Sequence, residues 1–318
     1  MAEEGSWEDA TTMKRSHLLA IVAGVAIFFT YNSFADDLIP IPALVDSAIP
    51  AITYPSLSLA ATDKPKPYFD RCHTQQNLTK SSVPCIYGNL KSKVAIVLFG
   101  DSHALSWFPA VEKVALIKKW KMYSYTMSSC TPSTIPAWND TTQLLMKNCA
   151  VWRTNILKSI TKIKPLLIFV SGTRGFTTID SSDKILLGES RTAAWEEGML
   201  KSLTILKKAS SRIVYIGDTP ASQFNVPDCL KKSPTSITAC ATAYKTSVWP
   251  DWQAQESKTA NSAGIIFFDP TSLICTTDPC SPLSDKYIIF SDAGHLTATF
   301  SRTLEKPLWD FVTTAIKF

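Results

Sequence analysis

The sequence of 318 residues predicts a three-layer α/β/α domain built on a five-stranded, mainly parallel β-sheet. Five short apolar runs have the length and the β-branched or aromatic composition of buried strands. They alternate with longer stretches that repeat apolar residues at helical spacing, which favours right-handed β-α-β units. The predicted strands are 94–99, 121–127, 166–170, 212–216 and 264–268, and the predicted helices are 108–120, 143–163, 192–208 and 295–316.

Composition limits the number of domains and the kind of partner. With 45% hydrophobic residues, the chain can bury one main core and a small appendage. The 32 Lys+Arg residues against 27 Asp+Glu give a formal net charge of +5, and no run of five like charges occurs. We therefore expect no nucleic-acid partner.

An apolar stretch near the N-terminus predicts a membrane segment over 17–35, either a transmembrane helix or a signal segment. Its flanks are basic on one side and acidic on the other: Lys14, Arg15, Asp36 and Asp37. This charge order places 1–16 in the cytoplasm and the rest of the chain outside it. We expect a single-pass protein of the cell membrane, with cleavage and secretion left open by the small residues around Ala35.

Residues 36–90 are rich in Pro, Ser, Thr and Ala and show no sustained periodicity. Such a composition is typical of an extended spacer, here one that ends in a small stapled loop. We expect it to hold a main domain, 91–318, away from the bilayer. Docking of its last part onto that domain is a hypothesis.

Eight cysteines, an even set in four close sequential couples, favour disulfides in an exported protein. Connectivity does not follow from sequence, but pairing within each couple would close four short loops. Zinc is the rival interpretation, yet no Cys-x-x-Cys occurs and only four histidines are present, so we expect neither a metal nor a cofactor. The disulfide candidates are Cys72, Cys85, Cys130, Cys149, Cys229, Cys240, Cys275 and Cys280.

A candidate nucleophile follows the first predicted strand, where the sequence reads Gly100-Asp101-Ser102-His103. Parallel sheets place functional groups at the carboxyl ends of their strands. Ser102 there lies near backbone amides that favour developing negative charge. Gly100 permits a tight turn, and Asp101 is suited to fixing the loop by accepting amide hydrogen bonds.

A serine nucleophile needs a base and a third group that orients the base. His295 lies in the loop that opens the last predicted helix, and Asp292 is three residues upstream. Each motif alone is an ordinary turn or helix start. Because the first strand exit and the last helix entrance of one α/β domain can meet in one crevice, we predict that Ser102, Asp292 and His295 form a catalytic triad.

These motifs resemble those of a known class. Residues 99–104, Phe-Gly-Asp-Ser-His-Ala, are similar to the first block of SGNH hydrolases, and residues 292–297, Asp-Ala-Gly-His-Leu-Thr, to their last block. The closest likeness is to the SGNH domain associated with bacterial acyltransferase-3 membrane proteins, and it covers roughly residues 70–318. The resemblance implies a flavodoxin-like SGNH fold and O-acyl transfer to, or removal from, cell-envelope glycans.

One departure concerns the oxyanion hole. Many SGNH enzymes carry a Gly-x-Asn-Asp block after the third strand, whereas residues 170–175 read Val-Ser-Gly-Thr-Arg-Gly. Without the Asn, we name Thr173 and Arg174 as candidate donors, together with backbone amides at Ser102 and at the Ser129-Cys130 turn. The acyltransferase-linked group often lacks that Asn, so the departure favours this specific likeness.

The functional hypothesis is O-acyl (acetyl) transfer onto an envelope polysaccharide through an acyl-Ser102 intermediate. With one apolar segment, the chain requires a separate membrane acyltransferase-3 protein as acyl donor, unless it is the C-terminal part of a longer fused protein. The alternatives are a carbohydrate acetylesterase and an inactive glycan-binding module. Three tryptophans in predicted loops are candidates for a carbohydrate-stacking surface, but nothing in the sequence places them beside the crevice: Trp138, Trp249 and Trp252.

Overall fold

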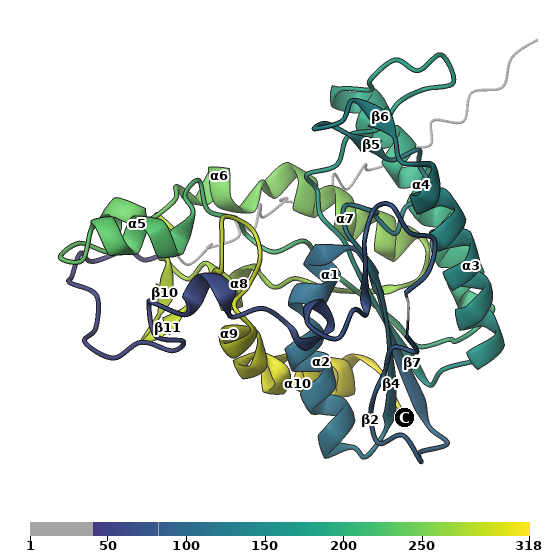
Figure 1. Cartoon of the computed structure of the whole chain (residues 1–318), viewed down its shortest axis with the longest axis horizontal. Helices are drawn as coiled ribbons and strands as arrows, with labels where there is room; N and C mark the ends of the chain where they lie inside the picture. The colour runs from purple at the N-terminus through teal and green to yellow at the C-terminus, as the bar shows by residue number, and fades with distance from the viewer. Residues whose placement is uncertain (1–40, 82) are drawn as a thin grey trace, which may run out of the picture. The chain divides into compact units, whose positions relative to one another are not determined.

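The computed structural model describes residues 41–81 and 83–318 (Figure 1). Its centre is a seven-stranded sheet in which the five predicted strands are all present and all parallel, in the order β4-β3-β7-β8-β9. These strands are β3 (Ala95–Gly100), β4 (Lys121–Met127), β7 (Leu167–Ser171), β8 (Ile213–Ile216) and β9 (Ile266–Phe268). The prediction of a mainly parallel α/β sheet is confirmed.

The register of the three central strands aligns their carboxyl ends. Gly100 of β3 pairs with Thr126 of β4 on one side and with Ser171 of β7 on the other. All three strand ends therefore reach the same edge of the sheet, and the loops that follow them share one face of the molecule.

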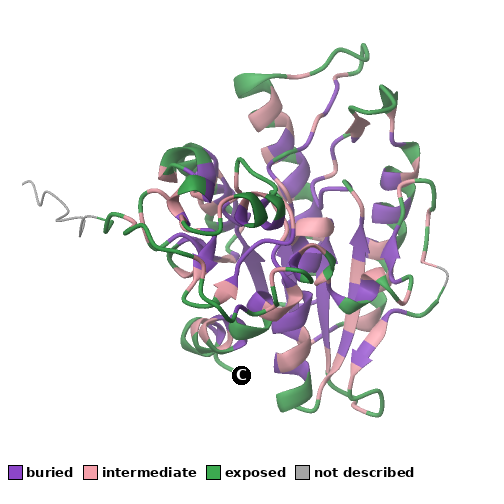
Figure 2. Ribbon diagram, turned by 60° about the vertical axis from the view of Figure 1, so that its left-hand side comes forward, coloured by how far each residue is buried: buried purple, intermediate pink, exposed green. Residues whose placement is uncertain are grey.

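Helices cover both faces of the sheet, because successive side chains of a strand point to opposite faces. Ile96 and Leu98 of β3 share a buried cluster with residues of α2, α9 and α10, whereas Val97 and Phe99 share another with residues of α3, α4 and α7. Figure 2 shows the buried strands between partly exposed helices. The helices are α1 (Ser102–Ser106), α2 (Phe108–Ile117), α3 (Lys147–Ile163), α4 (Gly188–Lys207), α5 (Val226–Lys232), α6 (Tyr244–Val248), α7 (Pro250–Ser262), α8 (Thr271–Ile274), α9 (Ala298–Thr303) and α10 (Glu305–Ala315).

Two predicted helices begin later than expected, whereas α4 begins four residues earlier than the predicted 192 and α2 ends before the predicted 120. The helix predicted from 143 begins only at Lys147, because β5 (Trp138–Asn139) and β6 (Leu144–Leu145) form an antiparallel hairpin with Gln143 at a positive φ of 53°. The helix predicted over 295–316 begins at Ala298, where the Thr297 hydroxyl caps it by accepting from the Phe300 amide. It is also divided into α9 and α10 at Leu304.

The predicted spacer over 36–90 differs from expectation in its described part. Residues 41–318 form one compact unit, so the domain boundary lies well before the predicted 91. This segment supplies two strands, β1 (His73–Thr74), parallel to β4, and β2 (Ile86–Gly88), antiparallel to β4. Its scattered apolar residues have no period because they pack individually onto the core, as Ala60, Leu57 and Tyr68 do.

Within these described ranges, no helix combines the length and the apolar character needed to cross a bilayer. The membrane segment predicted at 17–35, and the cytoplasmic segment predicted at 1–16, lie outside the described residues.

The eight cysteines pair within their sequential couples, as the spacing suggested. Cys72–Cys85 joins the two added strands, and Cys130–Cys149 ties the loop after β4 to α3. The other two bonds lie in the segments that follow β8 and β9: Cys229 of α5 pairs with Cys240, and Cys275 pairs with Cys280.

Among these disulfides, Cys130–Cys149 closes the longest loop and Cys275–Cys280 the shortest, so their removal should destabilise the fold unequally. Replacing Cys130 and Cys149 together with serine should lower the free energy of unfolding by about 3 kcal/mol, because the bond restricts a long loop in the unfolded chain. The matched replacement of Cys275 and Cys280, only five positions apart, should cost about 2 kcal/mol. Urea denaturation of both double variants measures the difference, and the reverse order would contradict this account.

Candidate active site

The turn after β3 depends on Gly100. This residue has a φ of 152°, and a Cβ atom on it would lie 1.8 Å from the Ser171 carbonyl oxygen. Asp101 follows as the N-cap of α1 and is fully buried. Its Oδ1 accepts from the His103 amide at 2.8 Å and its Oδ2 from the Thr173 amide at 2.8 Å. Asp101 therefore holds the turn after β3 against the turn after β7.

The structure brings Ser102, His295 and Asp292 together. Ser102 Oγ lies 2.8 Å from His295 Nε2, and His295 Nδ1 lies 3.0 Å from both carboxylate oxygens of Asp292. The carboxylate is fixed from the backbone as well, since its Oδ1 accepts from the amides of Gly294 and His295 at 2.9 and 2.8 Å. A carboxylate on Nδ1 keeps the proton there and leaves Nε2 free to accept the serine proton.

Asp292 has a cationic neighbour that the sequence did not reveal. Lys64, from the N-terminal part of the domain, donates from its Nζ to Asp292 Oδ2 at 2.7 Å. Burial alone would raise the pKa of Asp292, but the hydrogen bonds and charges of His295 and Lys64 outweigh it, so that this pKa lies well below its usual range. The carboxylate is therefore ionised throughout the neutral range. Lys64 lies 228 positions from its partner, and no local motif marks it.

A buried ionic cluster lies beside the turn that carries Ser102. His103 Nδ1 is 2.5 Å from Asp218 Oδ1, and Asp218 Oδ2 accepts from the Arg174 amide at 2.9 Å. Burial by itself lowers the pKa of His103, but attraction to Asp218 is stronger and raises it to about 9. Glu256 accepts from the Asp218 amide at 3.1 Å and from the Tyr215 hydroxyl at 2.9 Å, and burial raises its pKa to about 8.

The side chains named as oxyanion donors are mostly engaged elsewhere. The buried guanidinium of Arg174 donates to the carbonyl oxygens of Ser247 and Val248. The Thr173 amide donates to Asp101, and its hydroxyl accepts from the Gly175 amide at 2.9 Å. The expectation that Arg174 offers its side chain to an oxyanion is therefore not supported.

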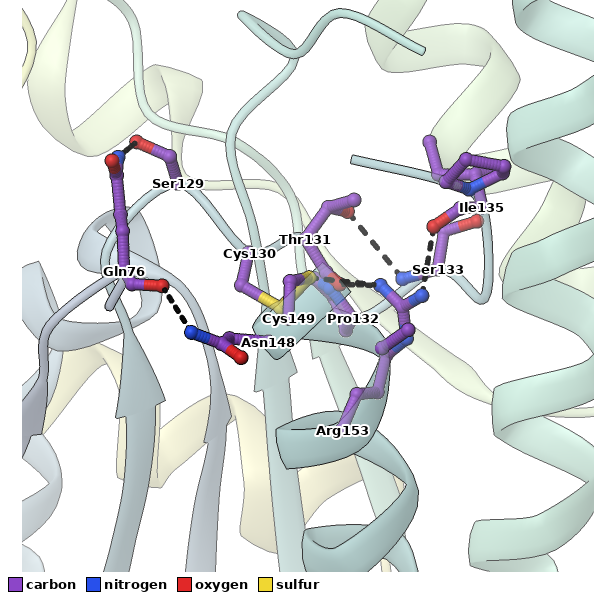
Figure 3. The surroundings of a disulfide bond; sticks show 12 residues. Gln76, Ser129, Cys130, Thr131, Pro132, Ser133, Ile135, Asn148, Cys149 and Arg153 are labelled. Carbon is purple, nitrogen blue, oxygen red and sulfur yellow. Dashed lines mark hydrogen bonds between the residues drawn. A yellow bond between two sulfur atoms is a disulfide. The ribbon is translucent and has the colours of Figure 1, made fainter. Parts of the chain in front are cut away.

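The amide of Ser102 is a better placed donor, because it is the first of α1 and has no intrahelical acceptor. The turn after β4 supplies the other backbone candidate. Ser129 there adopts a left-handed φ of 55°, and its hydroxyl accepts from Gln76 Nε2 at 3.0 Å (Figure 3).

The loop after Ser129 is held in place by Cys130–Cys149 and by a buried arginine (Figure 3). Arg153 of α3 donates from its two terminal nitrogens to the carbonyl oxygens of Thr131 and Ile135, at 2.9 and 2.7 Å. These contacts fix the backbone of the β4 exit, where the Cys130 amide already donates to the Met127 carbonyl oxygen at 3.3 Å.

Solved structures resemble this chain to different degrees, and the first one named here supports the fold. The periplasmic domain of a lipopolysaccharide acetyltransferase from Salmonella ser. Paratyphi A matches with a TM-score of 0.55 at 18% identity, over 71% of this chain and 85% of that one. A GDSL-like lipase from Bacteroides thetaiotaomicron matches with a TM-score of 0.44 at 11% identity, over 71% and 91%. A peptidoglycan O-acetylesterase matches with a TM-score of 0.36 at 14% identity, over 62% and 48%. No curated protein matches the chain.

A family model described as the SGNH domain fused to AT3 domains matches residues 71–310. That span contains the turn of Ser102 after β3, the cluster around Asp218 and the loop of Asp292 and His295. Since it also covers well over half of the chain, this protein belongs to the SGNH family whose members are fused to AT3 domains.

Proposed function

We propose that this domain is a serine-dependent O-acyltransferase that moves an acetyl group onto a hydroxyl of a cell-envelope glycan. The observation that carries the proposal is the unbroken chain of hydrogen bonds from Ser102 through His295 to Asp292 at the carboxyl edge of the sheet. Membership of a family fused to AT3 domains supports a membrane acyltransferase-3 protein as the acyl donor.

In the first half-reaction, Ser102 Oγ attacks the acyl carbonyl carbon while its proton passes to His295 Nε2. The bond to the donor's oxygen or sulfur then breaks, and His295 returns the proton to that leaving atom. Asp292 stabilises the imidazolium formed in between, and the Ser102 amide is directed to the oxyanion. An acyl-serine ester remains.

In the second half-reaction, His295 removes a proton from a glycan hydroxyl, whose oxygen attacks the acyl-serine carbonyl. The Ser102 ester bond breaks, and its oxygen regains the proton from His295. The four disulfides favour an oxidising, extracytoplasmic compartment, which is where an envelope glycan is available as the acceptor.

The test compares the O-acetyl content of envelope polysaccharide in cells that carry the unsubstituted protein with that in cells that carry the Ser102→Ala variant. Transfer predicts a fall in O-acetyl groups in the variant cells, measured as acetate released by mild alkali. An increase would instead identify a carbohydrate acetylesterase. Equal acetate in the two strains would contradict both activities.

A further inference from the structure

An exposed tryptophan lies close to the triad. Trp249 separates α6 from α7, and its side chain is 46% exposed. It lines a cavity of about 360 Å³ together with His103 and Gly294. His103 directly follows Ser102, and Gly294 directly precedes His295. The cavity therefore lies next to the nucleophile and its base.

The orientation of the Trp249 ring is fixed before any ligand arrives. The guanidinium of Arg174 lies over the ring, 5.2 Å from its centre, and is held there by the carbonyl oxygens of Ser247 and Val248. Because Arg174 is itself buried, little side-chain freedom is lost when a ligand packs against the exposed part of the ring.

The walls of this cavity are mainly apolar, with one large aromatic group and several polar side chains among them. Ser222, Gln223 and Thr246 are the polar, uncharged residues that line it near Trp249. A sugar ring offers one C–H face for an aromatic ring and hydroxyls for polar partners. The lining is thus matched to a pyranose.

A second cavity, of about 430 Å³, adjoins the first along Trp249. Arg191, Lys245 and Gln255 line it together with Trp249. Because Trp249 borders both cavities, a ligand that extends across its side chain occupies both at once. This arrangement suits a chain of linked sugars rather than a single small molecule.

We propose that these two cavities bind consecutive pyranose units of the acceptor glycan, with Trp249 packed against a sugar ring between them. The sugar whose hydroxyl reacts lies in the cavity beside His103. This inference rests on the proposed function for the nature of the ligand, but its test measures binding and does not require turnover.

The test uses the full-length chain carrying Ser102→Ala, so that bound sugar is not consumed. Saturation-transfer NMR with chitotriose, maltotriose and mannotriose as probes should give a signal for at least one of them. Adding Trp249→Ala should weaken the Kd of that sugar about tenfold, whereas Trp249→Phe, which keeps an aromatic face, should restore most of it.

The matched control is Phe318→Ala, which removes an aromatic side chain of similar exposure, 51%, packed against Trp120 and Trp309. This variant should bind the sugar as the parent does. Circular dichroism of each protein checks that it is folded. An unchanged Kd in the folded Trp249→Ala protein, or no signal from any of the three sugars, would overturn the inference. Failure of Ser102 as nucleophile would appear in ester hydrolysis and not in this binding measurement.

Discussion

Replacing Ser102 with alanine is expected to lower kcat for hydrolysis of 4-nitrophenyl acetate by about 10⁴-fold or more. A small activated ester needs no glycan and no membrane partner, so it reports on the acyl-serine step alone. Removal of a serine nucleophile leaves only the oxyanion donors and general binding, which account for a small part of catalysis in serine enzymes. The measurement is release of 4-nitrophenolate by the purified full-length protein.

The matched control is Ser182→Ala. Ser182 is an exposed serine in the loop between β7 and α4, and its replacement should leave kcat unchanged within twofold. Thermal melting of both variants checks that the Ser102→Ala protein keeps its fold. More than a tenth of the original kcat in the folded Ser102→Ala protein would exclude Ser102 as the nucleophile, whatever its hydrogen bond to His295.

The central strands were predictable because they are buried on both faces and read as continuous apolar runs. β7, with all five residues buried, is an example. The strands β1 and β2 gave no such signal, because they are two and three residues long and form only through their pairing with β4. The proline-rich composition of residues 36–90 therefore suggested a spacer, whereas single apolar residues of its described part pack onto the core.

The candidate site likewise contains residues that the sequence predicted and residues that it did not. The hydrogen-bonded arrangement of Ser102, Asp292 and His295 was predictable because the turn of Ser102 and the Asp292–His295 pair are local motifs beside a strand end and a helix start. Lys64 was not, since its carboxylate partner lies far away in the sequence. Asp218 did have a signal: it follows β8 closely, at the edge where functional groups of parallel sheets gather, and the strand-exit rule would have found it.

Replacing Asp218 with asparagine is expected to reduce stability about as much as losing the Cys130–Cys149 disulfide. Asp218 is nearly fully buried and accepts from both His103 and the Arg174 backbone. Asparagine keeps the shape but leaves the His103 cation and the Arg174 guanidinium without a buried counter-charge. We expect the free energy of unfolding at pH 6 to fall by about 3 kcal/mol, in line with the raised pKa of His103. Urea denaturation gives the value.

The pH dependence of this loss of stability shows whether Asp218 stabilises the fold mainly through His103 or through Arg174. The pKa of His103 is about 9 in the folded protein, against an ordinary value of 6.5. A raised folded pKa means that the stabilisation is fully present below about pH 6.5 and is lost as the pH rises through 9. The stability gap between the Asp218→Asn variant and the parent should therefore narrow between pH 6 and pH 10. Arg174 stays charged over this range, so a gap that remains constant would assign the role of Asp218 to Arg174 and contradict the His103 pairing.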